Sequence, residues 1–288
     1  MLITGLLLRV WRWRHLVAVG TPDIDTLALF RSYMSGQLLN WYFPGRMGDI
    51  SRVYHVGQTG KGNSFSLGTI VVEKLMDLIA FAGLFFLVML SYPLPVWIRS
   101  AAGMVGLFGL FAILGMIGLV RVPDRFVNLL RLLLRWIPEA LQSRFVAIFK
   151  SGISSLDVIR DWQGALSMIV LTGVIWLFSI LTNYFLLFAF SLRLEWISAV
   201  ILLVALQAGI TLPGAPGRFG VFQYICILVL GLFQVDQATS LSYGITLQAV
   251  VLLPVTILGS ISMIHFAYQS MGVKSEPAAT EINRQTND

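Results

Sequence analysis

The chain has 288 residues, of which 57% are hydrophobic and only 12% are charged, and its mean hydropathy is +0.82. These values exclude an ordinary soluble domain and indicate an integral membrane protein. The net charge of +6 does not indicate nucleic-acid binding, because the basic residues flank apolar runs, as the positive-inside bias requires. The single Cys226 excludes an intrachain disulfide, and the histidines have no metal-ligand spacing. We therefore expect no metal and no cofactor.

The N-terminal apolar stretch, residues 2–8, is short, and its positive charges at Arg9, Arg12 and Arg14 follow it. A signal peptide has the opposite order, so we exclude one. Two interpretations are open. The stretch is the last two turns of a membrane helix whose beginning is missing from this reading frame, or a short interfacial anchor helped by two tryptophans.

Apolar stretches of two lengths follow along the chain. A helix needs about 20 residues to cross the hydrocarbon core. Four stretches are long enough, and the last should bend at Pro254: 67–90, 102–120, 167–190 and 241–267. Three are shorter, and each abuts a loop that contains Pro-Gly-Arg: 26–43, 196–212 and 219–234.

The connection 121–160 is rich in arginine and should lie in the cytoplasm. On a helical wheel, Asp124, Arg125, Arg131 and Arg135 fall within an arc of about 120°, and four leucines lie largely outside it. This pattern favours an amphipathic helix on the inner leaflet, with a connecting helix packed against the bundle as the alternative. We expect residues 1–272 to form one transmembrane domain and 273–288 a polar, disordered cytoplasmic tail.

The Pro-Gly-Arg-x-Gly pattern occurs twice, and both copies interrupt apolar segments. Both flanks of 26–43 are basic, so this segment should dip into the membrane and turn back. The pair 196–212 and 219–234 either spans twice or dips from outside, and its short length favours dipping. The expected fold is an all-α polytopic membrane protein, an inverted-repeat helical bundle with re-entrant or broken helices, whose two loops line a cavity near the midplane.

The loop residues suit an anionic headgroup. Glycine permits a sharp turn, proline stiffens it, and arginine offers a planar fork of donors to a phosphate. The alternative is an ordinary surface turn with a snorkelling arginine, which the second copy disfavours. The candidate substrate-binding residues are Arg46, Arg52, Arg218, Gln223 and Asn40, and the candidate loop-forming residues are Pro44, Gly45, Gly48, Pro213, Pro216, Gly217 and Gly220.

A group of charges lies inside the first long apolar stretch. Glu73 and Asp77 are one helical turn apart, and Lys74 can pair with Asp77. Charges within a bilayer are costly and normally paired, so Arg46 or Arg52 should be their partners. The alternative places these groups in water at the cytoplasmic interface. With Asp49, these residues form the expected charge network: Asp49, Glu73, Lys74 and Asp77.

The ordered set PGRMGD with Arg52, then VVEKLMD, then LPGAPGRFGVFQ resembles the transmembrane region of lysylphosphatidylglycerol synthases and related stand-alone flippase-like proteins. The likeness runs from about residue 6 to 267. It implies lipid translocation, with any lipid-modifying catalytic domain on a separate protein. It also supports a missing N-terminal beginning. The motif residues that the resemblance carries over are Pro44, Gly45, Arg46, Gly48, Asp49, Arg52, Glu73, Asp77, Pro213, Pro216, Gly217 and Gly220.

Three positions depart from the family pattern. Lys74 replaces an arginine, Arg218 a glycine and Gln223 a glutamate. The last change removes a negative charge from the second loop. An uncharged or purely anionic headgroup is therefore a safer expectation than a lysylated lipid.

The expected function is a flippase or scramblase of the cytoplasmic membrane. Its substrate would be an anionic phospholipid, an aminoacyl-phospholipid or a polyprenyl-phosphate-linked lipid. Transport is expected rather than chemistry, because no catalytic constellation occurs. One alternative is an intramembrane enzyme with Glu73 or Asp77 as general acid or base. Another is a non-catalytic subunit that docks a soluble transferase through 121–160. The expected partners are the lipid, a separate transferase and further copies of the chain.

Overall fold

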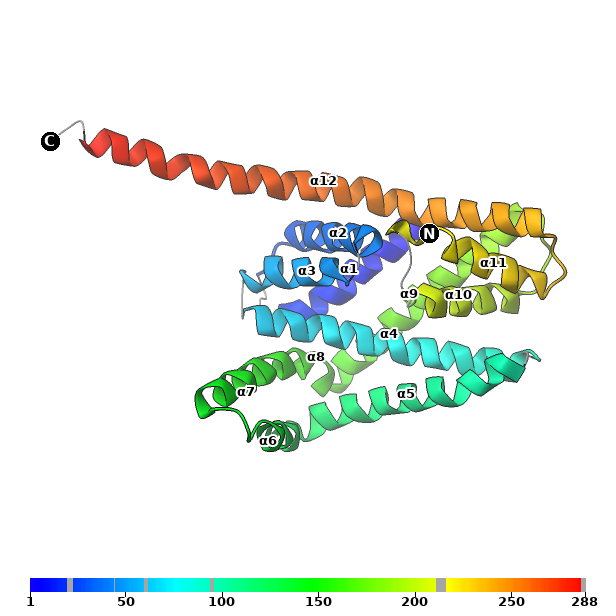
Figure 1. Ribbon diagram of the computed structural model, residues 1–288, viewed down its shortest axis with the longest axis horizontal. Helices are drawn as coiled ribbons and strands as arrows, with labels where there is room; N and C mark the ends of the chain where they lie inside the picture. Colours follow the sequence, from blue (N-terminus) through cyan, green and yellow to red (C-terminus); the bar gives the residue numbers. More distant parts are fainter. Residues whose placement is uncertain (20–22, 44, 60–61, 94–95, 211–215, 286–288) are drawn as a thin grey trace.

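The computed structural model describes residues 1–19, 23–43, 45–59, 62–93, 96–210 and 216–285, and these contain helices and no strand (Figure 1). Each of the four long apolar stretches lies, to within one residue, inside one long helix, as predicted. The elements are α1 (Leu2–Ala18), α2 (Thr26–Tyr42), α3 (Met47–Gly57), α4 (Asn63–Ser91), α5 (Val96–Arg121), α6 (Pro123–Leu133), α7 (Glu139–Ile153), η1 (Ser154–Leu156), α8 (Asp157–Arg160), α9 (Trp162–Ala189), α10 (Trp196–Ile210), η2 (Pro216–Arg218), α11 (Val221–Gly231) and α12 (Gln237–Gln285).

In the described residues, α9 and the Gln237–Gln269 part of α12 are long and apolar enough to cross a membrane, and Val105–Arg121 of α5 with α6 is a third candidate if this bent pair is one span. Helix α4 has 29 residues and carries its charged groups in its first half. Helix α12 is continuous through Pro254, and it also passes the boundary at residue 272 where the sequence places the tail.

Two helical hairpins lie on either side of the middle of the helical bundle (Figure 1). We call α2 with α3 the N-terminal hairpin, and α10, η2 and α11 the C-terminal hairpin. In Figure 1 the turns of both hairpins point towards the middle of the molecule, while α4 and α12 run along both. The predicted pair of opposed hairpins is therefore present in the fold.

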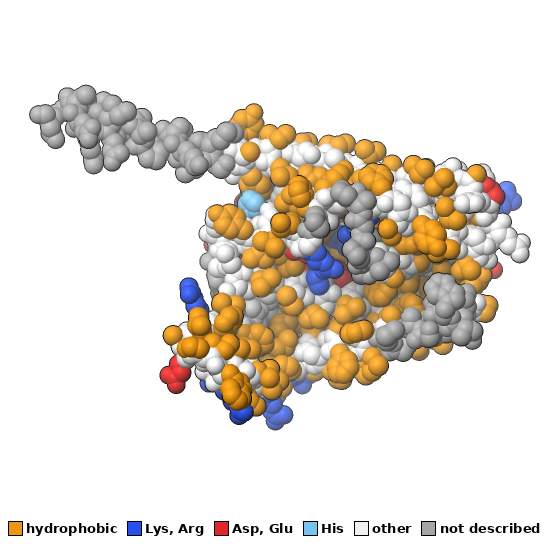
Figure 2. All heavy atoms as spheres, viewed as in Figure 1, with side chains coloured by type: hydrophobic (Ala, Val, Ile, Leu, Met, Phe, Trp, Pro, Cys, Tyr) orange, Lys and Arg blue, Asp and Glu red, His pale blue; other side chains and the backbone are white. Residues whose placement is uncertain are grey.

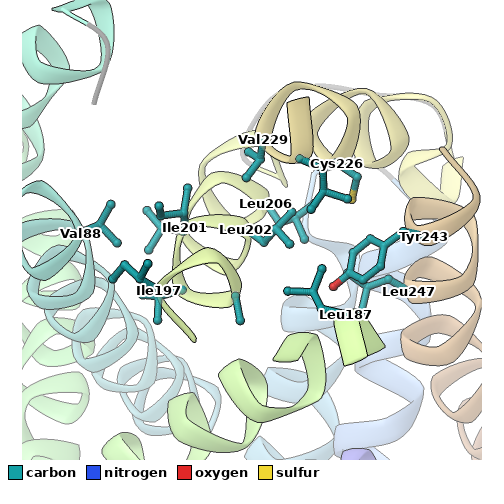
Figure 3. Close-up of a cluster of buried hydrophobic side chains, with 14 of the residues drawn as sticks. Val88, Leu187, Ile197, Ile201, Leu202, Leu206, Cys226, Val229, Tyr243 and Leu247 are labelled. Atoms are coloured by element: carbon teal, nitrogen blue, oxygen red, sulfur yellow. The ribbon is translucent and has the colours of Figure 1, made fainter. Parts of the chain in front are cut away.

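Each hairpin packs on its own hydrophobic core. The N-terminal core combines α1 and α2 with the first half of α4 and includes Trp13, Tyr33 and Met76. The C-terminal core surrounds α10 and α11. Figure 3 shows Leu202, Leu206, Cys226, Tyr243 and Leu247 converging there from α10, α11 and α12. The space between the two cores is where the hairpin turns meet.

Helix α12 packs closely against each of the two hairpins, and at each contact it has a glycine. A Cβ atom on Gly259 would lie 2.8 Å from the carbonyl oxygen of Met34 in α2. A Cβ atom on Gly244 would lie 3.1 Å from Cβ of Cys226 and 3.2 Å from Cα of Gln223, both in α11. These two glycines let the backbones approach, and they join both hairpins to one helix.

The N-terminal segment differs from both sequence interpretations in its extent. Helix α1 does not end at residue 8 but continues through the arginines to Ala18. Arg12 and Trp13 are fully buried, and the Trp13 Nε1 donates a hydrogen bond to Thr69 Oγ1 at 3.0 Å. An interfacial anchor would expose this tryptophan, so that interpretation is wrong for Trp13.

Helix α6 turns away from α5 by 104° and lies at one end of the bundle (Figure 1). Three of its leucines, Leu129, Leu132 and Leu133, are exposed, Leu130 is half-buried, and Val127 is the buried residue of this helix. The Trp136 side chain that follows is also exposed. The placement of this helix on the inner leaflet stays a prediction.

Candidate functional site

Both hairpin turns share an unusual backbone conformation. Gly45 and Arg46 have φ values of 73° and 55°, and Gly217 and Arg218 have values of 71° and 61°. A left-handed conformation costs a residue other than glycine roughly 1–2 kcal/mol. Such strain persists only where the surroundings impose it, and it is concentrated at functional sites. The repeated sequence motif is therefore also a repeated structure, with an arginine at each strained position.

The two arginines come together in one cavity. A cavity of about 1120 Å³ lies between the two hydrophobic cores, and Arg46 and Arg218 both line it. The Arg218 guanidinium lies 4.6 Å from the ring centroid of Trp41 in α2, so the C-terminal turn contacts the N-terminal hairpin. The charge of Arg46 also acts on Arg218. Figure 2 shows basic and acidic side chains gathered near the middle of this face, within a largely hydrophobic surface.

The cavity combines a basic part with apolar walls. Its basic residues come from four separate elements, which sequence spacing alone does not bring together. They are Arg9 of α1, Arg46 of the N-terminal turn, Lys74 of α4 and Arg218 of the C-terminal turn. The apolar side includes Leu203, Leu206, Phe222, Leu247 and Val251.

The N-terminal turn is closed by two polar residues and two glycines. The Asn40 amide donates to Asp49 Oδ1 at 3.0 Å, and its carbonyl oxygen accepts from the backbone N–H of Asp49 at 3.2 Å. A Cβ atom on Gly48 would lie only 1.7 Å from the carbonyl oxygen of Gly36, so α2 and α3 touch backbone to backbone. Asn40 lines the cavity, but its amide is used to hold the turn.

Arg52, a predicted substrate-binding residue, is fully buried and is not among the residues that line the cavity. Its Nη2 donates to Glu73 Oε2 at 2.6 Å, and its Nη1 lies 3.5 Å from Asp49 Oδ1. The guanidinium is 4.0 Å and 4.5 Å from the ring centroids of Trp13 and Tyr33. Arg52 thus holds α3 against α1, α2 and α4.

Arg12 is the buried partner of Asp77. Its Nη1 and Nη2 donate to the two carboxylate oxygens at 2.8 and 3.1 Å, and Nη1 also donates to Thr172 at 3.0 Å. Its Nη2 lies 3.9 Å from Glu73. The sequence did not reveal this role, because Arg12 belongs to a basic run that looks like a positive-inside signal. We define the charge network by the residues Arg12, Asp49, Arg52, Glu73, Lys74 and Asp77.

Of the predicted pairings within the charge network, one is wrong and one is confirmed. Lys74 lies 3.9 Å from Asp49 and is not paired with Asp77. The prediction that Arg46 or Arg52 is a partner of these carboxylates is confirmed for Arg52, which pairs with Glu73, whereas Asp77 is paired with Arg12. Arg46 has no carboxylate partner in the described residues. Glu73 is 2% exposed, so it does not sit in water at an interface. The pairing of charges in space depends on helix packing, which local spacing does not report.

Gln223 has a structural role in the C-terminal turn, although sequence suggested a contact to substrate. Its Oε1 accepts from the backbone N–H of Gly220 at 2.8 Å, and its Nε2 donates to Gln248 Oε1. Gln248 in turn donates to the Gly217 carbonyl oxygen at 2.6 Å. Both ends of the strained turn are thereby fixed by side-chain amides.

Pro44 and Pro213 lie outside the described residues, and of Pro216 only the backbone is described. No group of His, Cys, Asp and Glu side chains suited to a metal ion occurs in the described part of the chain.

A sequence model of the lysylphosphatidylglycerol synthase TM region matches residues 1–259. The chain belongs to this family. The match spans both hairpins, the charge network and the cavity, so the protein is a multi-pass membrane protein of the lysylphosphatidylglycerol synthase transmembrane type. Neither a curated protein nor a solved structure matches the chain.

Proposed function

We propose that this chain is a lipid translocase of the cytoplasmic membrane, a flippase or scramblase whose lipid headgroup passes through the central cavity. The observation that carries the proposal is the meeting of Arg46 and Arg218, each on a strained turn of an opposed hairpin, in one cavity between the two halves. Paired interrupted segments in two halves of a membrane protein typically form a substrate site near the midplane.

The lining of the cavity suits an amphipathic molecule. Arginine binds phosphate oxygens through a planar fork of donors, and the basic residues provide several such groups. The apolar walls, which include Leu203 and Phe222, suit acyl chains at the edge of the cavity. A lipid headgroup would cross among the arginines while its chains stay in hydrocarbon.

The distribution of charge supports an orientation. Helices α6 and α7 carry basic side chains, including Arg125, Arg131 and Arg144, and the positive-inside bias favours a cytoplasmic location for such a segment. The N-terminal hairpin would then enter from the cytoplasmic side and the C-terminal hairpin from outside.

The carboxylates favour transport over catalysis. Glu73 and Asp77 are bonded to buried arginines, so neither is placed as a free general acid or base. They serve to neutralise Arg52 and Arg12. If purified protein in detergent converted a phospholipid into a new product without any partner, the enzyme alternative would be correct instead.

The translocase proposal is tested by lipid transfer in proteoliposomes that contain fluorescent phosphatidylglycerol. A charge-assisted hydrogen bond contributes roughly 1.5–3 kcal/mol. Arg46→Ala and Arg218→Ala should therefore each weaken headgroup binding by about ten to a hundredfold, and the rate of transfer should fall accordingly at low lipid content. Arg144→Ala is the matched control, because Arg144 is exposed on α7 away from the cavity. Unchanged transfer by folded Arg46→Ala and Arg218→Ala proteins would refute this mechanism.

A further inference from the structure

The cavity has more positive charge than its own carboxylates neutralise. Arg9, Arg46 and Arg218 line it, and none of the three has an ion-pair partner within the described residues. They come from α1 and from the two turns, so they surround the cavity instead of forming a run on one helix. An unpaired cation in a low-dielectric setting attracts an anion.

The two carboxylates that line the cavity, Asp49 and Asp77, are already engaged. Asp77 receives both terminal nitrogens of Arg12, and Asp49 is bonded to Asn40 and lies within ion-pair distance of Arg52 and Lys74. Arg12 and Arg52 are fully buried. Drawing either carboxylate towards an ammonium group would leave a buried guanidinium uncompensated, which is strongly unfavourable.

The C-terminal turn does not provide a carboxylate for an ammonium group either. The nearest side chain after this turn that could accept a hydrogen bond from an ammonium group is that of Gln223. It is neutral, and its amide oxygen and nitrogen are both already hydrogen-bonded. A cationic headgroup would therefore face three unpaired arginines without an available anion.

We propose, on the basis of the translocase function above, that the substrate has a net negative headgroup with a phosphate and no amino group. The phosphate binds between Arg46 and Arg218, and Arg9 takes a further oxygen. Phosphatidylglycerol and phosphatidic acid have this chemistry, whereas a lysylated phosphatidylglycerol has a net positive headgroup. The acyl chains lie along the apolar wall formed by Leu206, Phe222 and Val251.

The test is competitive lipid binding to the full-length chain in detergent, measured by native mass spectrometry. Equimolar phosphatidylglycerol and lysylphosphatidylglycerol compete for the protein. We expect phosphatidylglycerol to be retained in excess by about tenfold or more, since both lipids offer a phosphate but only the lysylated lipid brings ammonium groups next to unpaired arginines. Equal retention, or preference for the lysylated lipid, overturns the proposal.

Charge reversal at the C-terminal turn tests whether the preference for phosphatidylglycerol arises in this cavity. Arg218→Glu supplies a free carboxylate and removes a cation, so it should bring the retention ratio close to one or invert it. Arg144→Glu makes the same change of charge on the exposed surface and should leave the ratio unaltered. A ratio that does not respond to Arg218→Glu overturns the assignment to this cavity.

Soluble competitors distinguish a lipid from a free phosphate. Inorganic phosphate and glycerol phosphate should fail to displace phosphatidylglycerol at equal concentration, because they make no contact with the apolar wall. Displacement at equal concentration means that the site recognises phosphate alone and overturns the lipid assignment.

The binding and transfer experiments test the two proposals separately. Selective binding of phosphatidylglycerol without any transfer refutes the translocase function and supports the headgroup class. Equal transfer of phosphatidylglycerol and its lysylated form refutes the headgroup class and supports the translocase function.

Discussion

The two hairpins end in the same strained Gly-Arg turn but are held in place by different forces. The N-terminal hairpin depends on buried ion pairs and on the direct backbone contact between Gly36 and Gly48. The C-terminal hairpin rests on an apolar core, with Gln223 and Gln248 as its polar support. Two turns of the same conformation are therefore stabilised by different interactions, and the two hairpins should respond differently to mutation.

The largest effect is expected for Glu73→Ala in the N-terminal hairpin. This change leaves the buried Arg52 without its closest partner and weakens the neutralisation of Arg12, at a cost of about 3–5 kcal/mol. Thermal unfolding in detergent should show a large loss of stability. Glu139→Ala removes an exposed carboxylate from α7 and is the control. Equal stability of the two variants would show that the ion pairs do not hold this hairpin.

Glycine substitutions compare the closeness of packing in the two hairpins. In Gly48→Ala the new Cβ would lie 1.7 Å from a backbone oxygen, whereas in Gly209→Ala it would lie 1.9 Å from the flexible Cδ1 atom of Ile225. Overpacking costs about 1–3 kcal/mol, so Gly48→Ala should lose at least this much stability and Gly209→Ala clearly less. Thermal unfolding of the purified variants measures both. The reverse order of stabilities would contradict the structure.

A moderate effect is expected for Gln248→Leu in the C-terminal half. The substitution leaves the Gly217 carbonyl oxygen and the Gln223 amide without this partner, at a cost of about 1–3 kcal/mol. Thermal unfolding should detect the loss, and lipid transfer should fall because the turn that carries Arg218 is no longer fixed. Gln237→Leu, at an exposed position at the start of α12, should change neither quantity.

The smallest effect is expected at the exposed beginning of α12. Hydrogen bonds from Thr239 lower the pKa of Asp236, so the unfolded chain binds this proton more readily than the folded one. The stabilisation is present above the ordinary carboxyl pKa of about 3.9 and is lost as the pH falls below it. The stability difference between wild type and Asp236→Ala should therefore shrink between about pH 6 and pH 3. A difference that does not depend on pH would show that the hydrogen bonds to Asp236 do not stabilise the start of α12.

Local patterns were sufficient for the helices and for the two turns. Apolar length predicted α4, α5, α9 and α12, and the repeated Pro-Gly-Arg pattern predicted the opposed hairpins, because both signals depend on neighbouring residues. The pairing of Arg12 with Asp77 joins residues 65 positions apart, and the Arg218 contact with Trp41 joins the two halves. Such contacts arise from packing between helices, so no local spacing predicts them.

The glycine contacts of α12 set the distance between the two halves. Gly244 and Gly259 are separated by 15 positions, which corresponds to about 22 Å along an α-helix. The spacing of the two glycines along α12 thus determines the distance between the two hairpins and the side of α12 on which each hairpin packs. One residue inserted between the glycines would rotate one contact about the helix axis by about 100° relative to the other. The angle between the two glycines about this axis therefore determines whether Arg46 and Arg218 can line the same cavity.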